Sequence, residues 1–278
     1  MSMPPLFIVG APRSGNTLTR RVLMASGQIY IPPETYVIGE IIERWPRWFW
    51  LSWREKVWLL CAYFDRHKHR ADLDIESFSP FADDAITWPK ARQTLPALFD
   101  ALYAFMGREH GYPAARWGDK TPWNTMHLRG IVRRYPQAWY LHLIRDGRDA
   151  VASQIKADMR DLSGSAERWV VANRACLKHL PKGPRTLAMR YEDLVRDPEE
   201  SFARIFDWAG LRFEPRFLTE MPQKLGDVGV HAHHAQVLRP ITPDSIGKWR
   251  QSLSPEALTQ LSPEFRKMMA ELSYQMAD

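Results

Sequence analysis

The chain has 278 residues and a formal net charge of +6, from 38 lysine and arginine residues against 32 aspartate and glutamate residues. This length can bury a large core, and we expect one α/β domain over residues 1–278 with a helical insertion. The basic residues form no long run, which argues against a nucleic-acid-binding protein, although a mildly basic chain suits an anionic cofactor or partner. Two cysteines are too few for a disulfide framework.

The sequence predicts a soluble, cytoplasmic protein without a membrane span. The first apolar run begins within a few residues of the N-terminus, without the basic and then apolar pattern of a signal peptide. The longest apolar stretch in the middle, residues 57–64, is much shorter than the roughly 20 residues that cross a bilayer. The oligomeric state is left open, with a homodimer among the options.

The N-terminal segment predicts a strand, a tight loop and the start of a helix. Residues 6–9 are continuously apolar, as in a buried strand of a parallel sheet; the loop begins at Gly10 and the helix near Asn16. The amide groups of such a loop and helix N-terminus point at one spot and favour an anion. The plainer alternative is an ordinary strand–turn–helix with a charged tip.

The loop departs from the nucleotide-binding pattern G-x-x-x-x-G-K-[ST] at one informative position. Gly10, Gly15 and Thr17 match that pattern, but Asn16 stands where the lysine belongs, and the only cation in the loop is Arg13. The missing lysine normally reaches the β- and γ-phosphates of ATP. The loop therefore favours a phosphate-like ligand whose transferred group meets Arg13.

Glu34 follows two prolines, Pro32 and Pro33, which hold the chain in a stiff, extended segment. A carboxylate on a rigid loop soon after an anion site is a candidate functional group. From position alone, a solvated glutamate or an aid to the next helix N-terminus is the favoured interpretation.

Residues 36–115 predict a helical insertion or lid over the sheet. Helical patterns recur near 37–48, 52–67 and 91–109 without a clear strand. The Trp-rich region 45–58 could line an acceptor pocket, but aromatic residues at helical spacing more often belong to a core.

The segment 118–122 predicts another helix start, with Thr121 as N-cap and Pro122 as the first helical residue, and the helix extends to about Arg134. A second strand, 138–144, then leads into Arg145.

The strand 138–144 ends at a second candidate anion site. Arg145 comes at its carboxyl end, where ligands bind in open α/β sheets, and Ser153 lies two turns into the following helix. Arg145 could equally pair with Asp149.

A third strand, 185–190, precedes Tyr191 and the acidic pair 192–193. An acidic pair after a strand resembles the Walker B acid of nucleotide-binding proteins. We discount a Walker B role because the Walker lysine is absent. In the tail, His231, His233 and His234 favour a flexible polar loop over a metal site, because no cysteine or helix-spaced partner accompanies them.

Five motifs in order resemble the sulfotransferases that use 3′-phosphoadenylyl sulfate (PAPS). Residues 11–17 resemble the 5′-phosphosulfate loop of that family, and residues 143–153 resemble its 3′-phosphate motif. The segments 118–122, 190–194 and 246–250 also match. The resemblance spans essentially the whole chain and implies a P-loop-type central parallel β-sheet flanked by helices, with the insertion after the first βα unit.

Within the family, the pattern is most similar to tyrosylprotein sulfotransferases and their bacterial relatives. Glu34 stands at the distance from Arg13 at which those enzymes carry their general base, and the segments 237–240 and 247–249 resemble their C-terminal part. The resemblance therefore makes Glu34 the expected base.

The resemblance also implies roles for the other site residues. Arg13 and Lys248 are expected to hold the sulfonate and the bridging oxygen. The 5′-phosphate is expected to bind to the loop residues Ser14, Gly15, Asn16 and Thr17. Arg145 and Ser153 are expected at the 3′-phosphate, Tyr191 and Lys248 at PAPS, and Lys120 is a second-rank candidate. No metal is expected, because the sulfuryl end carries a single negative charge.

The acceptor is expected to be a hydroxyl on an acidic tyrosine-containing peptide, a glycan or a small molecule. Asn16 departs from the family, which usually has a hydroxyl residue there, and residues 36–115 match nothing and are the expected acceptor side. Two alternatives remain: a Mg-ATP-dependent P-loop kinase of small molecules, and a non-catalytic nucleotide-binding module.

Overall fold

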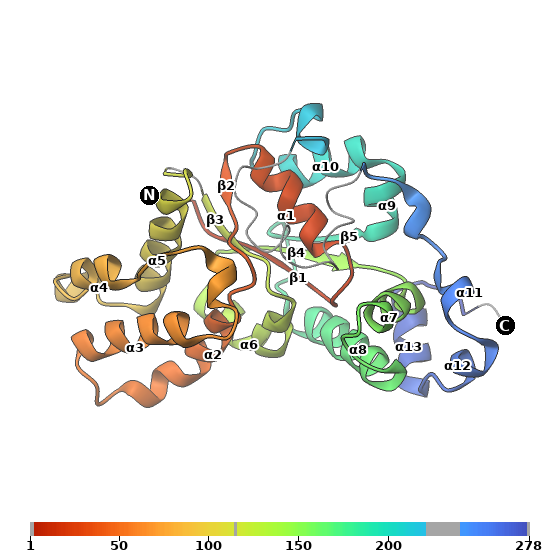
Figure 1. Cartoon of the computed structure of the whole chain (residues 1–278), viewed down its shortest axis with the longest axis horizontal. Helices are drawn as coiled ribbons and strands as arrows, with labels where there is room; N and C mark the ends of the chain where they lie inside the picture. Colours follow the sequence, from red (N-terminus) through yellow and green to blue (C-terminus); the bar gives the residue numbers. More distant parts are fainter. Residues whose placement is uncertain (1–2, 114–115, 221–239, 277–278) are drawn as a thin grey trace.

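A parallel five-stranded sheet forms the centre of the computed structural model, which describes residues 3–113, 116–220 and 240–276 (Figure 1). The strands run in the order β2-β3-β1-β4-β5, and every neighbouring pair is parallel. Their bounds are β1 Leu6–Gly10, β2 Ile29–Tyr30, β3 Arg116–Asp119, β4 Trp139–Ile144 and β5 Thr186–Arg190. The predicted α/β class is confirmed.

Strand β1 occupies the middle of the sheet. All five of its residues are buried, since β3 and β4 flank it and helices cover both faces, so a continuous apolar run suits this position. The strand ends at Gly10, where φ is +150° and an added Cβ would lie 2.3 Å from the carbonyl oxygen of Leu143. Only glycine lets β1 run this close to β4.

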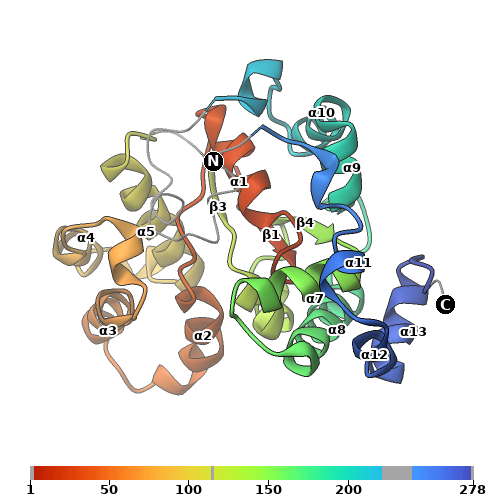
Figure 2. The ribbon, with the colours of Figure 1, turned by 45° about the vertical axis from the view of Figure 1, so that its right-hand side comes forward.

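Helices cover both faces of the sheet, as Figures 1 and 2 show. One face carries α1 (Asn16–Ala25), α9 (Tyr191–Arg196) and α10 (Pro198–Trp208). The other carries α6 (Leu128–Arg134), α7 (Gly147–Lys156), α8 (Leu162–His179) and α13 (Pro263–Glu271). Two short helices, α11 (Trp249–Ser252) and α12 (Pro255–Thr259), precede α13. The central parallel sheet is thus flanked by helices on both faces, as predicted (Figure 1).

The insertion is helical, as predicted. It contains α2 (Val37–Arg44), α3 (Trp53–Arg66), α4 (Ser79–Ala85) and α5 (Leu95–Glu109). These helices form a lobe beside the β2–β3 edge of the sheet instead of a cover across one face (Figures 1 and 2). Helix α5 contacts β3 and α2 contacts α6, so the lobe is joined directly to the sheet layer.

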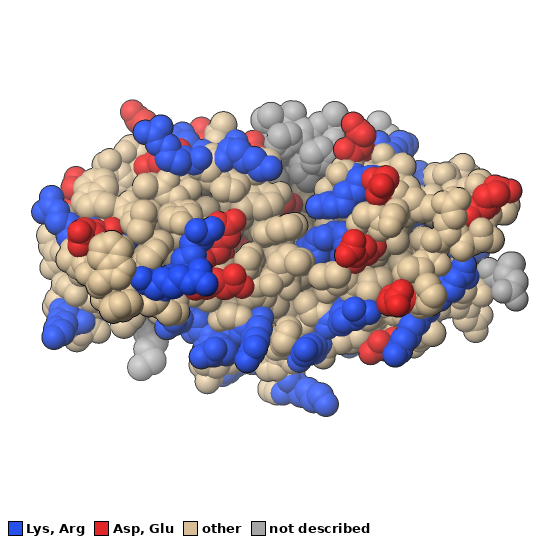
Figure 3. Space-filling view, turned by 90° about the horizontal axis from the view of Figure 1, so that it is seen from below, with Lys and Arg blue, Asp and Glu red and all other residues tan. Residues whose placement is uncertain are grey.

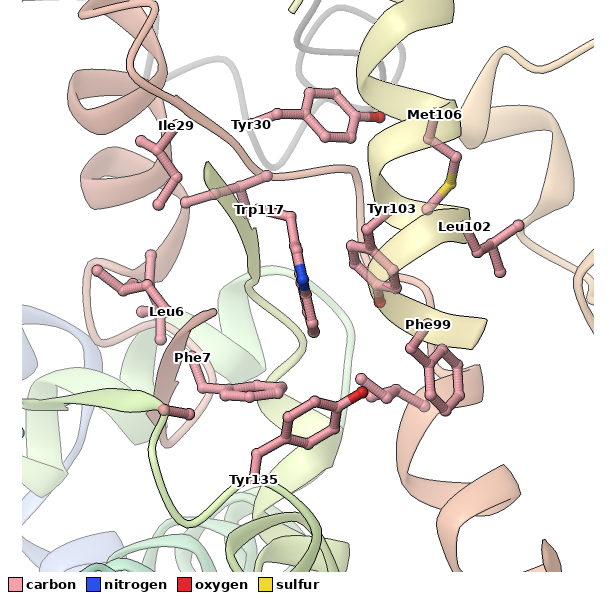
Figure 4. Close-up of a cluster of buried hydrophobic side chains, with 14 of the residues drawn as sticks. Leu6, Phe7, Ile29, Tyr30, Phe99, Leu102, Tyr103, Met106, Trp117 and Tyr135 are labelled. Atoms are coloured by element: carbon pink, nitrogen blue, oxygen red, sulfur yellow. The ribbon is translucent and has the colours of Figure 1, made fainter. Parts of the chain in front are cut away.

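Aromatic packing connects this lobe to the sheet (Figure 4). The ring of Trp117 in β3 lies 4.4 Å from that of Tyr103 in α5, 5.7 Å from Phe7 and 5.8 Å from Tyr135, measured between centroids. Large aromatic contacts of this kind add to the stability that apolar burial provides.

The Trp-rich region divides between core and surface. Trp48 is buried, whereas Phe49 and Trp50 are 83% and 70% exposed. The expectation that its aromatic residues belong to the core therefore holds for only part of the region.

Two strands lie where the sequence predicted none. β2 has only two residues, and β3 contains an arginine, a glycine and an aspartate, yet all four residues of β3 are buried. The buried guanidinium of Arg116 is satisfied by the carbonyl oxygens of Pro4, Pro5 and Ala209. Polar residues can occupy a central strand when distant main-chain groups meet their hydrogen-bonding needs.

The helix predicted from Pro122 begins differently. Residues Pro122–His127 form a 3₁₀-helix before α6, and the Thr121 hydroxyl accepts a hydrogen bond from the amide of Thr35 instead of capping the helix. Other 3₁₀ segments are Trp45–Trp48, Arg70–Leu73, Lys90–Arg92, Pro215–Leu218 and Pro243–Ser245.

The face of the molecule seen from below carries both basic and acidic side chains (Figure 3). In the view from below, lysine and arginine side chains gather along the lower edge, and acidic side chains lie among others elsewhere (Figure 3). Within the described residues, no helix has both the length and the apolar character that crossing a membrane requires.

Candidate active site

The loops after β1 and β4 meet at a reversal of strand order. β1 and β4 are neighbours, but the chain forms β2 and β3 on the other side of β1 before it reaches β4. In an open parallel sheet, the crevice at such a reversal is where ligands bind. Here Arg145, at the end of β4, donates from Nη1 to the carbonyl oxygen of Arg13 at 2.8 Å.

Arg13 has a left-handed backbone, with φ of 67°. Such strain in a non-glycine residue is concentrated at functional sites. Its side chain reaches across to α7, where Nε donates to the Ser153 hydroxyl at 3.0 Å. Burial lowers the pKa of Arg13, and repulsion from Arg145 adds to this, while Tyr191 and Glu34 act in the opposite direction. The structure thus brings Arg13, Arg145 and Ser153 together as a poorly solvated positive centre.

Arg145 makes several of the contacts in this cluster. Besides Arg13, it donates from Nη2 to the carbonyl oxygen of Ser245 at 2.9 Å, and its guanidinium lies 4.3 Å from the ring centroid of Tyr191. The hydroxyls of Tyr191 and Ser245 are 2.6 Å apart. The Arg145 Nε is buried without a hydrogen-bond partner among the described residues. A buried donor left over in a cationic cluster suits an anionic oxygen.

The loop itself fits a phosphate group. The Ser14 hydroxyl is buried without a hydrogen-bond partner in the described structure, and the first amides of α1 have no acceptor inside the helix. Gly15 has φ of +89°, and a Cβ there would lie 2.7 Å from the Tyr191 ring. The loop therefore leaves a cradle of donors, and a side chain at position 15 would strain the loop backbone and collide with the Tyr191 ring.

Asn16 has a structural use that the sequence did not show. Its side-chain amide donates from Nδ2 to the carbonyl oxygen of Ala11 at 3.0 Å and closes the loop on itself. Its carboxamide oxygen is buried without a partner in the described region. One donor of the Asn16 side chain, which we expected at the 5′-phosphate, is therefore occupied within the loop.

Glu34 is a paired and largely buried carboxylate. Its Oε1 lies 2.7 Å from Nζ of Lys120, whose side chain is fully buried, and the Glu34 side chain is only 21% exposed. Its Oε2 accepts a hydrogen bond of 2.5 Å from the Tyr36 hydroxyl. The interpretation as a solvated loop glutamate is wrong, and Lys120, ranked second from the sequence, is its direct partner.

A buried network fixes the segment that carries Glu34. Thr35 donates from its hydroxyl to Oδ2 of Asp119, which also accepts from the Tyr103 hydroxyl at 2.6 Å. The other oxygen of Asp119 accepts from Nδ2 of Asn124 at 2.6 Å. Burial raises the pKa of Asp119, and its hydrogen bonds oppose that rise. The network was missed because its members lie on β3, α5, a 3₁₀-helix and a loop, with no pattern along the chain.

Lys248 is placed by its main chain. Asp149 accepts from the amides of Gly247 and Trp249, at 2.7 and 2.9 Å. The Lys248 side chain is exposed and makes no hydrogen bond or ion pair to any described residue. The structure therefore shows no hydrogen bond between Lys248 and Arg13, the two described residues that we expected to hold the sulfonate. Asp149 is therefore a partner of this segment and not of Arg145.

Glu192 has a structural position. Its Oε1 accepts from the amide of Asp146 and its Oε2 from the Tyr274 hydroxyl, at 2.9 and 2.8 Å. These contacts agree with our rejection of a Walker B role. The histidines at 231, 233 and 234 and the segment 237–239 lie outside the described residues.

Comparisons with known proteins point to one family. Residues 4–215 match a family model described as the sulfotransferase family. Protein-tyrosine sulfotransferase 2 of Gallus gallus is 27% identical over 286 residues, covering 98% of this chain and 70% of that protein. Protein-tyrosine sulfotransferase 1 of Homo sapiens is 28% identical over 289 residues, with coverage of 98% and 70%. The sulfotransferase domain of the Synechococcus PCC 7002 olefin synthase shares the fold, with a TM-score of 0.68, 22% identity and coverage of 100% and 98%.

Proposed function

The chain belongs to the sulfotransferase family and is a transferase, and from this premise we propose that it moves the sulfuryl group of PAPS to an acceptor hydroxyl. The products are a sulfate ester and PAP, the nucleotide that remains. The main support is the cluster of Arg13, Arg145 and Ser153 beside the loop after β1, in which the Arg145 Nε and the Ser14 hydroxyl are buried without partners among the described residues. In this proposal Glu34, which is ion-paired with buried Lys120, is the base.

In this proposal the loop and the Arg145 cluster bind the nucleotide. The amides of residues 14–17 take the 5′-phosphate, while Arg145 and Ser153 take the 3′-phosphate and Tyr191 flanks it. The hydrogen bond between Arg13 and Ser153 gives way, so that Arg13 turns to the sulfonate. The unpartnered Arg145 Nε and Ser14 hydroxyl support this assignment.

The transfer forms a bond between sulfur and the acceptor oxygen and breaks the bond between sulfur and the bridging oxygen of the nucleotide. Arg13, Lys120 and Lys248 offset the charge on these oxygens, which requires positioning more than covalent chemistry. The acceptor proton passes to Glu34. General-base assistance is worth about 10²–10⁴-fold in rate.

The timing of proton transfer follows from the acidities. A phenol has a pKa of about 10, far above that of a carboxylate, so Glu34 cannot ionise a tyrosine in advance. Proton removal late in the transfer, as the acceptor oxygen becomes acidic, is the consistent order of events.

For the acceptor, we propose a tyrosine in an acidic peptide, with a glycan or a small hydroxyl compound as the alternatives. The relatives named protein-tyrosine sulfotransferases support the first choice, as does the basic net charge, which would steer an acidic peptide. The helical insertion at 36–115 is the proposed acceptor side of a single domain, because Glu34 leads directly into α2.

The decisive experiment compares Glu34→Gln with wild-type protein, using PAPS labelled in its sulfuryl group and peptide, glycan and phenol acceptors. The variant should transfer about 10²–10⁴-fold more slowly, with nearly unchanged affinity for PAP. Glu109→Gln, at an exposed position on α5, is the matched control and should behave as wild type.

Other outcomes separate the alternatives. Unchanged transfer in the variant removes Glu34 from the mechanism. Stabilisation by ATP and Mg²⁺ but not by PAP, in a thermal-shift assay, indicates a kinase. Binding of PAP without transfer to any acceptor indicates a non-catalytic nucleotide-binding protein.

A further inference from the structure

We propose that Tyr36 is a positioning residue for the Glu34 carboxylate and links it to the helical lobe through His67 and His69. This inference deepens the proposed function and rests on it only for the role of Glu34 as base. Neither the loop pattern nor the pairing with Lys120 accounts for Tyr36.

Tyr36 completes the restraint of the carboxylate. Lys120 holds Oε1 at 2.7 Å, and the Tyr36 hydroxyl donates to Oε2 at 2.5 Å. Hydrogen bonds to a charged carboxylate are short and roughly twice as strong as neutral ones. With a donor on each oxygen, the carboxylate of Glu34 has a fixed plane. The fixed plane also fixes the directions in which the oxygen lone pairs of Glu34 can accept the proton of an acceptor hydroxyl.

The backbone of Tyr36 is strained. This residue is the N-cap of α2, with φ of 56° and ψ of −9°, in the left-handed region that glycine favours. An aromatic residue there costs about 1–3 kcal/mol and persists only where surrounding contacts over-determine it. The left-handed turn lies between the extended segment of Glu34 and the first turn of α2. This turn lets the Tyr36 side chain fold back onto the carboxylate of Glu34, two residues earlier in the chain.

Two histidines of the insertion hold the Tyr36 ring. The ring centroid lies 4.8 Å from that of His69 and 5.4 Å from that of His67, with interplanar angles of 22° and 13°. His67 is the C-cap of α3, and His69 lies 3.5 Å from the Asp72 carboxylate. Stacked rings contribute beyond simple burial. The stack therefore ties the Tyr36 ring to the C-terminal end of α3, and a phenylalanine at position 36 can preserve the stack.

The contact has a chemical consequence for the base. A donor to the ionised carboxylate stabilises that form, so Tyr36 and Lys120 together keep Glu34 charged and ready to accept a proton. Removal of the Tyr36 hydroxyl takes away the donor to Oε2. The carboxylate then has more rotational freedom and a higher proton affinity.

The test is Tyr36→Phe, which removes the hydroxyl and retains the ring. Its matched control is Tyr63→Phe on α3, because the Tyr63 hydroxyl makes no hydrogen bond within the described structure. Loss of one charge-assisted hydrogen bond should lower kcat about ten- to a hundredfold, with KM for PAPS and affinity for PAP unchanged. Tyr63→Phe should leave all of these at wild-type values.

A second readout does not depend on activity. In protein labelled with carbon-13 at the glutamate carboxyls, the signal missing from Glu34→Gln identifies Glu34, and its titration gives the midpoint directly. Tyr36→Phe should raise this midpoint by about one pH unit. An unchanged midpoint overturns the inference. So does an equal loss of PAP affinity and of thermal stability, which would mark a general structural defect. If wild-type protein transfers no sulfuryl group, the proposed function fails while the titration still decides the role of Tyr36.

Discussion

Asp149 holds the main chain on both sides of Lys248, although the two residues lie in separate parts of the chain. One oxygen accepts from the Gly247 amide and the other from the Trp249 amide. Asp149 is buried in the first turn of α7, directly after the segment that carries Arg145. The position of the Lys248 main chain is thus set by a carboxylate that makes no hydrogen bond or ion pair with the Lys248 side chain in the described structure.

Asp149→Asn should weaken PAPS binding through Lys248. An asparagine can accept only one of the two main-chain hydrogen bonds and leaves the other amide unpaired, at a cost of about 1–3 kcal/mol. We expect KM for PAPS to rise several-fold and hydrogen exchange at residues 247–249 to accelerate. The double variant with Lys248→Ala should be little worse than Lys248→Ala alone, since both act on one contact. Full additivity of the two effects, or exchange that remains slow, would contradict this role for Asp149.

Arg145→Ala should reduce the preference for nucleotides with a 3′-phosphate. The proposed contact is charge-assisted, and its loss should weaken PAP binding by about tenfold or more. Adenosine 5′-monophosphate, which lacks the 3′-phosphate, should lose much less affinity in the same titration calorimetry. Arg133→Ala, exposed on α6, is the control. Equal losses for both nucleotides would instead reflect collapse of the contacts that Arg145 makes to Arg13 and Ser245.

Asp119→Asn should destabilise the protein. Asp119 accepts hydrogen bonds on both oxygens from Thr35, Tyr103 and Asn124. The NH₂ group of an asparagine must face at least one of these donors, so a buried pair becomes two unsatisfied groups. We expect a loss of about 1–3 kcal/mol in the free energy of unfolding, measured with urea, while Asp83→Asn at an exposed position on α4 should change little. Equal stability of the two variants would show that the network is dispensable.

The sequence predicted the parts of the fold whose burial shows as an unbroken apolar pattern. β1 and β4 were placed correctly because strands inside a parallel sheet are apolar on both faces. The edge strand β5 was also placed correctly, although Met189 is its only buried residue. β3 was missed because its buried polar residues are satisfied by groups remote in sequence, such as the carbonyl oxygens around Arg116. A local pattern carries no information about such partners.

The candidate site divides in the same way. The loop of Arg13 could be recognised from its spacing, since its anion-binding geometry is local to one strand–helix connection. Glu34 could not be assigned from position alone, because its partner Lys120 lies in a different segment, and only the family resemblance pointed to it. Tyr36, a non-glycine in a left-handed conformation, gave no signal in the sequence.

His142 should make the protein less stable in mild acid. It lies in β4, almost fully buried, and its Nε2 donates to Oδ1 of Asn173 at 3.1 Å. Burial lowers the pKa of His142 to about 4, although the hydrogen bond opposes this. In the unfolded chain its pKa is about 6.5, so between these values the unfolded state binds the extra proton and stability rises with pH. On acidification from pH 7 to pH 4, this group should remove about 3 kcal/mol of unfolding free energy.

His142→Gln tests this dependence, because glutamine can donate to Asn173 without titrating. Urea unfolding at several pH values should show a flatter decline for the variant than for wild type, whatever its stability at pH 7. His179→Gln, at the half-buried C-terminal end of α8, should retain most of the wild-type slope because His179 is much less buried than His142. In wild-type protein, the imidazole carbon-13 signal of His142 should stay in its neutral position down to about pH 5. Equal slopes for wild type and His142→Gln would assign the acid sensitivity to other groups.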